Sequence, residues 1–139
     1  MSDQYGNPSQ DPGQPRETLT QDDKTWALIS HIGTLVSAYI ALGFLAPLVV
    51  MLVKGESSPF ARRHAVESLN FQISLLIYSL VGGVLAFLFV LMTVGLGMLV
   101  VLPLALALAV AVLALIIIAT VKAGNGEDYR YPFTIRFVS

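Results

Sequence analysis

Hydrophobic and polar residues separate into long blocks along this chain. No Asp, Glu, Lys or Arg occurs in the 29 positions between Lys24 and Lys54, or in the 54 positions between Glu67 and Lys122. A helix needs about 20 mainly apolar residues to cross roughly 30 Å of hydrocarbon. The first uncharged stretch therefore accommodates one membrane span, and the second accommodates two.

This block pattern predicts an all-α fold, an integral membrane bundle of three transmembrane helices with a disordered N-terminal tail. Residues 1–20 form the tail, because they contain hardly any apolar side chain to bury. Residues 21–139 form the membrane domain. Within this domain we expect an amphipathic helix start over 59–67, an aromatic and basic tail over 122–139, and spans at about 26–53, 68–92 and 98–121.

The first span allows a second interpretation. Gly43 and Pro47 lie in its second half, and a proline inside a helix predicts a kink because it lacks the backbone N–H. An alternative folds 26–53 into a re-entrant hairpin broken at Gly43, which keeps both chain ends on one side of the membrane. Irregular backbone at membrane depth must be buried in protein, so the continuous span is the prediction adopted.

Composition supports a membrane location and excludes several classes of protein. Hydrophobic residues make up 55% of the chain and charged residues only 12%, about half the charged share of a typical soluble domain. The net charge of -1 argues against a nucleic-acid partner, and the absence of cysteine excludes disulfide scaffolds and thiolate metal sites.

The distribution of Lys and Arg predicts an orientation. With three spans, two basic residues lie on the side of the N-terminal tail and the 93–97 turn, and six lie on the other side. The positive-inside rule then places the N-terminus outside and the C-terminus in the cytoplasm of a multi-pass plasma membrane protein. The expected partners are the lipid bilayer and its anionic headgroups at the cytoplasmic face.

Polar residues at membrane depth are costly and therefore mark candidate functional positions. Ser30, Thr34 and Ser37 form a hydroxyl stripe in the first span beside a histidine, and a second polar stripe opens the second span. They form either an interhelical polar seam or, for the hydroxyls, bonds to carbonyls of their own helix. The candidate interaction residues are His31, Arg62, Arg63, His64, Glu67, Asn70 and Gln72.

The chemistry of these residues gives little support to catalysis. His64 and Glu67 have the i, i+3 spacing of carboxylate-bridged metal sites, but the spans supply no other acid. We therefore expect no metal and no cofactor. No catalytic residue is predicted either, because the chain has no cysteine, no nucleophile elbow and no zinc-protease motif.

Small residues recur on the second and third predicted spans. Gly82 and Ala86 are spaced four apart, as are Ala107 and Ala111. Such spacing lets membrane helices approach closely. It predicts either tight packing between these two spans or self-association into a homo-oligomer.

Three segments carry a resemblance to a known family. They are DDKTWALISHIG, PLVVMLVKGESSPFARRHAVESLNFQIS and YRYPFTIRFV, and together they extend from about Asp22 to Val138. The combination resembles small bacterial membrane proteins of unknown function, which are similar to the twenty-kilodalton (Tic-type) membrane subunit of the chloroplast inner-envelope import translocon. The matching positions are Trp26, His31, Pro47, Pro59, Phe60, His64, Ala65, Asn70, Phe71, Gln72, Tyr131, Pro132 and Arg136.

The sequence therefore predicts a protein that is not an enzyme. The favoured function is an interaction or assembly subunit, with a link to protein translocation or membrane organisation that the resemblance implies. The alternative is a small oligomeric transporter or channel in which His31 relays protons.

Overall fold

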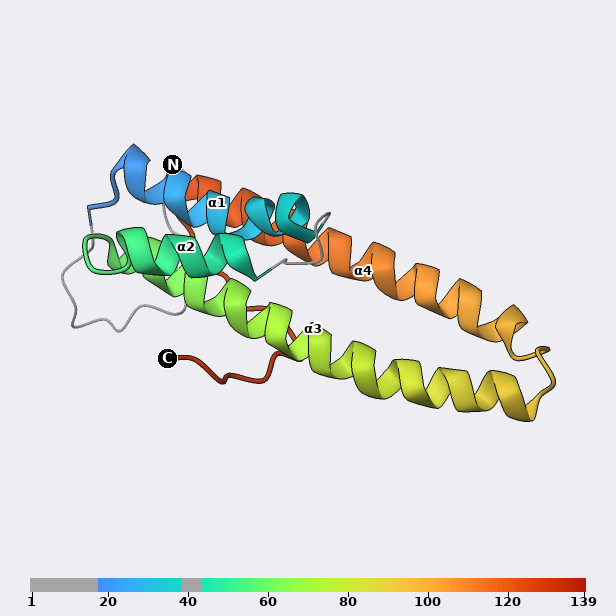
Figure 1. Ribbon diagram of the computed structural model, residues 1–139. Helices are drawn as coiled ribbons and strands as arrows, with labels where there is room; N and C mark the ends of the chain where they lie inside the picture. The colour runs from blue at the N-terminus through green and yellow to red at the C-terminus, as the bar shows by residue number, and fades with distance from the viewer. Residues whose placement is uncertain (1–17, 39–43) are drawn as a thin grey trace.

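The structure, a computed structural model, describes residues 18–38 and 44–139, and every regular element within them is a helix. The helices are α1 (Gln21–Ala38), α2 (Leu45–Lys54), α3 (Pro59–Met92) and α4 (Met98–Asn125). Figure 1 shows α3 and α4 as two long helices joined by a turn at one end, with α1 and α2 packed near their other end. The all-α prediction is confirmed, whereas most of the predicted polar tail, residues 1–17, lies outside the described residues.

Capping side chains define where α1 and α3 begin. The Asp23 amide donates to Thr20 Oγ1 at 3.2 Å, and the Thr20 amide donates back to Asp23 Oδ2 at 2.8 Å. Ser58 Oγ accepts the Ala61 amide at 3.2 Å, and Pro59 fills the first helical position, where no N–H is needed. Local sequence alone is therefore sufficient to start both helices.

A short turn over residues 93–97 reverses the chain between α3 and α4. Thr93 Oγ1 accepts the Gly97 amide at 2.8 Å, and Gly95 takes a φ of 88°, which glycine adopts without strain. The reversal falls at the residues where the hydropathy pattern ends one apolar stretch and begins the next.

The prediction of one continuous span over 26–53 is wrong. This segment forms parts of two helices, and their outer ends meet: Lys54 Nζ lies 2.6 Å from Asp22 Oδ2. The same ammonium lies 5.5 Å from the centroid of the Trp26 ring. The two helices therefore run antiparallel, as in the re-entrant alternative, although the proposed break at Gly43 lies outside the described residues.

Close approach and polarity explain why α1 and α2 pair instead of forming one long helix. A Cβ at Gly33 would come within 2.8 Å of Ala46 Cβ, so only glycine permits this spacing. The polar face of α1 is buried in the bundle, including Ser30, His31 and Thr34. A lone span would have exposed that face to lipid, where polar groups have no partners.

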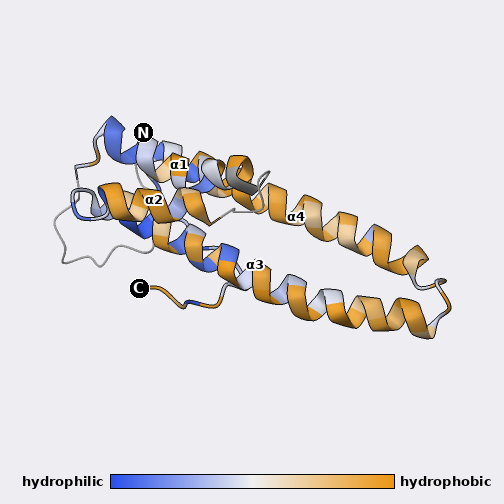
Figure 2. Ribbon diagram, in the orientation of Figure 1, coloured by the Kyte–Doolittle hydropathy of each residue, from blue (hydrophilic) through white to orange (hydrophobic). Residues whose placement is uncertain are grey.

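Two helices, α3 and α4, are long and apolar enough to cross a membrane, so three transmembrane helices are not confirmed. The 34 residues of α3 extend about 50 Å. Residues 75–92 and 98–115 with their turn form the spanning hairpin. The base consists of α1, α2, residues 59–74 and residues 116–139. Figure 2 shows the spanning hairpin as almost uniformly hydrophobic and the polar residues gathered in the base.

Gly82 and Gly83 of α3 do not pack against α4. A Cβ built on Gly82 or Gly83 would meet no atom within 4 Å. Tight packing of the two long helices at this face is therefore absent from the structure, and self-association through it remains a prediction.

Cysteine labelling tests this topology, because the chain has no cysteine of its own. We expect single cysteines replacing Gln21 and Ser57 to react with a membrane-impermeant maleimide from the same side. A cysteine replacing Val94 should react only from the opposite side. Labelling of Gln21→Cys and Ser57→Cys from opposite sides would restore a full first span.

Candidate functional site

A buried polar seam joins α1 to α3 in the base. Ser68 Oγ donates to the Ser30 carbonyl at 2.8 Å and lies 3.3 Å from Thr34 Oγ1. Both α1 hydroxyls also bond their own helix, Ser30 to the Ala27 carbonyl and Thr34 to the Ser30 carbonyl. The interhelical polar seam and the hydroxyl bonds within one helix, which the sequence offered as alternatives, are therefore both present. The side chain of Ser37 lies outside the described residues.

Two histidines and a tyrosine form a hydrogen-bonded chain at the centre of this seam. His31 Nε2 lies 2.7 Å from His64 Nδ1, and His31 Nδ1 lies 3.0 Å from the Tyr131 hydroxyl. All three side chains are almost completely buried. His31 is therefore the shared hydrogen-bond partner of the other two side chains, which are shielded from water.

Burial keeps the chain uncharged. Desolvation, reinforced by the nearby His64, lowers the pKa of His31 from 6.5 to about 3, and burial raises the pKa of the Tyr131 hydroxyl well above its usual value. Tyr131 therefore keeps its proton, and its hydroxyl and the two imidazoles form a chain of hydrogen bonds between uncharged groups, in which the histidine tautomers determine which atom donates. Burial likewise lowers the pKa of His64 to about 4, against the opposing effects of the nearby Asp128 carboxylate and of a backbone hydrogen bond with Glu127.

The C-terminal residues lie along a polar stripe of α3. Glu67 Oε1 accepts the Tyr131 amide at 2.8 Å, and Ser74 Oγ accepts the Ile135 amide at 2.9 Å. Asn70 binds the backbone three times: its Oδ1 accepts the amides of Phe137 and Val138, and its Nδ2 donates to the Val138 carbonyl, each at 2.8 Å. These side chains replace the partner strand that an extended segment otherwise needs.

Aromatic packing completes the attachment of this segment, residues 126–139, which we call the C-terminal strap. The Tyr131 ring stacks on Phe71 at a centroid distance of 3.9 Å and an interplanar angle of 7°. Both rings belong to a core cluster with Ile116 and Ala119 of α4. Tyr131 therefore couples the strap, α1, α3 and α4 through one side chain.

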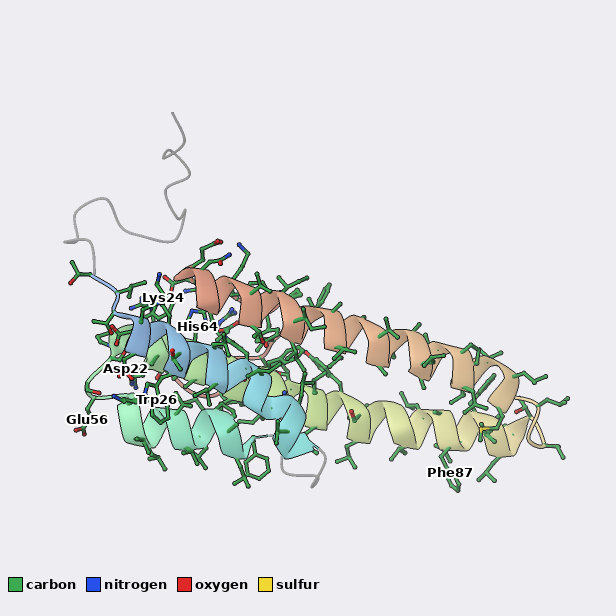
Figure 3. The ribbon with its side chains drawn as sticks, turned by 90° about the horizontal axis from the view of Figure 1, so that it is seen from above. Asp22, Lys24, Trp26, Glu56, His64 and Phe87 are labelled. Carbon is green, nitrogen blue, oxygen red and sulfur yellow. The ribbon has the colours of Figure 1, made fainter. Side chains whose placement is uncertain are left out.

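Charged residues gather at the base. Arg63 Nε lies 3.1 Å from Asp128 Oδ1, and Lys122 Nζ lies 2.6 Å from Glu127 Oε2, which lowers the pKa of Glu127. Figure 3 shows the contrast between the two ends by labelling Asp22, Lys24, Trp26, Glu56 and His64 at the base and Phe87 on the spanning hairpin. Exposed ion pairs of this kind add little stability, so the buried seam and the strap hold the base together.

The predicted site residues therefore fall into different environments. His31 and His64 meet in the seam, whereas Glu67 and Asn70 hold the strap. Arg62 donates to the Ser139 carbonyl at 3.0 Å, Arg63 pairs with Asp128, and Gln72 is half-buried beyond Ser68. The surface that the sequence suggested for a partner is occupied largely by the chain's own C-terminal segment.

Sequence reasoning missed three members of this arrangement: Tyr131, Ser74 and Tyr78. The sequence marked Tyr131 only as a position of resemblance, and it indicated no role for Ser74 or Tyr78. The available signal was the spacing of Glu67, Asn70, Ser74 and Tyr78, which places four polar side chains along one face of α3. Nothing in the sequence indicated that the backbone bound to this face lies 55 to 68 residues further along the chain.

The HxxE pair does not form a metal centre. His64 turns to His31, and Glu67 turns to the strap, where its Oε1 also lies 3.3 Å from Arg136. In the part of the chain that the structure describes, no group of three His, Asp or Glu side chains is suited to hold a metal ion.

Acidification tests the buried histidine chain. In the unfolded protein His31 binds a proton near pH 6.5, but in the folded protein only near pH 3. The free energy of unfolding should therefore fall as the pH drops through this window, with a His31 contribution of up to about 1.4 kcal/mol per pH unit. SDS titrations followed by fluorescence of Trp26, the single tryptophan, measure this slope.

Two variants isolate the His31 contribution. His31→Gln should lower stability at pH 7 and flatten the pH dependence, while Tyr131→Phe should lower stability and keep the wild-type slope. An unchanged slope in His31→Gln would show that this imidazole is not buried as described.

Proteolysis tests the strap. Asn70→Ala removes three backbone hydrogen bonds, each contributing about 1 kcal/mol, so the strap should open at least roughly tenfold more often. Mass spectrometry of tryptic peptides cut after Arg130 and Arg136 measures the opening. Gln72→Ala is the matched control, since no strap contact involves Gln72, and equal cleavage in both variants would contradict the attachment.

A comparison with models of known protein families gives a match over most of the chain. The model of the magnetosome magnetite crystal formation protein family matches residues 22–138. No curated protein and no solved structure matches the chain. The resemblance to the import-translocon family is therefore wrong: the segments that carried it lie within the range matched by a different family.

Proposed function

The chain belongs to the magnetosome magnetite crystal formation protein family, and from this premise we propose that it is a non-enzymatic membrane protein that organises the magnetosome membrane during crystal formation. The family match over residues 22–138 carries the proposal. Two apolar helices long enough to cross a membrane support it. The expected link to protein translocation has no support in this family and is not retained.

The proposed organising element is the base. Its buried surfaces are made by five separate parts of the chain: α1, α2, the start of α3, the end of α4 and the strap. A rigid unit of this kind suits a protein that holds a fixed shape against a membrane or a partner. Its exposed basic residues, Arg62 and Arg130, are suited to anionic headgroups.

We propose that the base faces the cytoplasm. The seven Lys and Arg residues within the described ranges all lie in the base, and the turn over residues 93–97 contains none. Because α1 and α2 run antiparallel, the described start of the chain and the C-terminus lie at the same end. The positive-inside rule then favours both of these ends in the cytoplasm, in place of the external N-terminus expected from three spans.

The transporter alternative has weaker support. His31 is buried, but the hydroxyls of Ser30 and Thr34 donate to carbonyls of their own helix. Hydroxyls engaged in this way fit a structural seam better than a path for protons. A proton flux in liposomes that His31→Ala abolishes would reverse this preference.

Complementation tests the proposed function. In a magnetite-forming bacterium that lacks its own family member, the full chain should appear in isolated magnetosome membranes and restore crystal size in electron micrographs. Gln72→Ala should restore it equally, whereas Asn70→Ala should insert normally but restore it poorly, because the base loses its strap. Absence of the full chain from magnetosome membranes, or no effect of wild-type protein on crystals, would refute the proposal.

A further inference from the structure

Packed side chains are unevenly distributed along the long axis of the molecule. All buried residues of α3 lie between Phe60 and Ser74, and those of α4 lie between Ile116 and Ala123. The most apolar part of α3 contains no buried residue. Figure 1 shows the consequence: α3 and α4 run alone through the spanning hairpin and are joined by α1, α2 and the strap only in the base.

The additional elements widen the base on opposite faces of α3. Ala61 and Ala65 contact Val50 of α2. Asn70, which holds the strap, follows Ala61 by about two and a half helical turns, so it points to the opposite side. The base is therefore broader than the spanning hairpin in two directions, and α3 lies between α2 and the strap.

Both α2 and the strap present apolar side chains to their surroundings. On α2, Leu52 is 72% exposed and Val53 is 60% exposed. On the strap, Phe133 is 90% exposed and Phe137 is 54% exposed. Leu52 and Val53 directly precede Lys54, and Phe137 directly follows Arg136, so apolar and basic side chains lie side by side on both surfaces. Lipid at the boundary between acyl chains and headgroups is the partner that fits them.

The strap is held at lipid depth by a specific contact. The Tyr78 hydroxyl donates to the Phe133 carbonyl at 2.8 Å. Tyr78 lies one turn beyond Ser74, where the exposed apolar surface of α3 begins. Phe133 also has a positive φ of 56°, which marks the point where the strap reverses. Its ring is therefore fixed at the edge of the hydrocarbon.

We propose that the protein is an intrinsic membrane wedge, whose spanning hairpin crosses the hydrocarbon and whose broader base lies among the headgroups of one leaflet. A helix with its side chains is about 10 Å wide, so each additional helix takes up roughly 80 Å² in the plane of the base leaflet. A bilayer accommodates such a mismatch by deforming. The strain is smallest where the base leaflet is convex, so the protein concentrates in membranes curved in that direction.

The proposal uses the membrane placement given above but does not depend on a role in crystal formation. Apart from that placement, it rests on the shape and surface chemistry of the protein. The base leaflet is the cytoplasmic one in the proposed orientation, which favours small compartments that bulge into the cytoplasm.

Oriented labelling in giant vesicles tests the wedge in the intact chain. Ser57→Cys lies in the exposed connection between α2 and α3, and Val94→Cys lies in the far turn. An impermeant fluorescent maleimide added outside marks copies with the base outward in the first variant and copies with the base inward in the second. Thin membrane tubes are then pulled from vesicles of neutral and anionic phospholipid.

The wedge predicts opposite sorting for the two labelled populations. Relative to a lipid dye, base-outward copies should be enriched in the tube by roughly twofold, and base-inward copies should be depleted. Asn70→Ala should reduce the enrichment in the Ser57→Cys background, whereas Gln72→Ala should leave it unchanged. Equal tube densities for the two orientations, or enrichment of both, would overturn the proposal.

The result of the tube experiment can be distinguished from that of the complementation experiment. Opposite sorting in tubes together with failed complementation would retain the wedge and remove the proposed function. Equal sorting together with restored crystals would remove the wedge and retain the proposed function.

Discussion

The need to satisfy buried polar groups inside the protein governs this structure. His31, His64, Glu67 and Asn70 lie close to a lipid-facing surface, and each finds its partner in another element of the base. Without α1 and the strap, these groups would be exposed near hydrocarbon without hydrogen bonds, at a cost of several kcal/mol each. Polar contacts therefore close the base together with its apolar core clusters, while most apolar residues of the spanning hairpin face outward.

The same requirement explains the pairing of α1 with α2. The polar face of α1 has its complement on α3, and the ion pair between Asp22 and Lys54 lies at the charged end of the base. A re-entrant hairpin must be buried in protein. The first half of α3, the end of α4 and the strap supply this protein, because together they cover α1.

Membership of the magnetosome magnetite crystal formation protein family gives this architecture a setting. A protein of such a family needs no catalytic centre to influence a membrane-bound process, provided that its shape and charge are fixed. The asymmetry between a broad base and a bare two-helix end is a fixed property of this kind, because Asn70 and Tyr131 lock the strap onto α3. The proposed membrane organisation and the proposed curvature preference both rest on this packing.

The sequence by itself determined the helical class, the two long apolar helices, the caps at Ser58 and Thr20, and the turn at 93–97, because each depends on hydropathy over one segment or on neighbouring residues. It also drew attention to His31, His64, Glu67 and Asn70, since polar groups stand out in an apolar stretch. Only the tertiary structure decided that 26–53 folds back on itself and that residues 126–139 occupy the polar stripe of α3. Both depend on contacts between distant segments, such as Gly33 against Ala46 and Tyr131 against His31. Hydropathy along the chain contains no information about which distant residues come into contact.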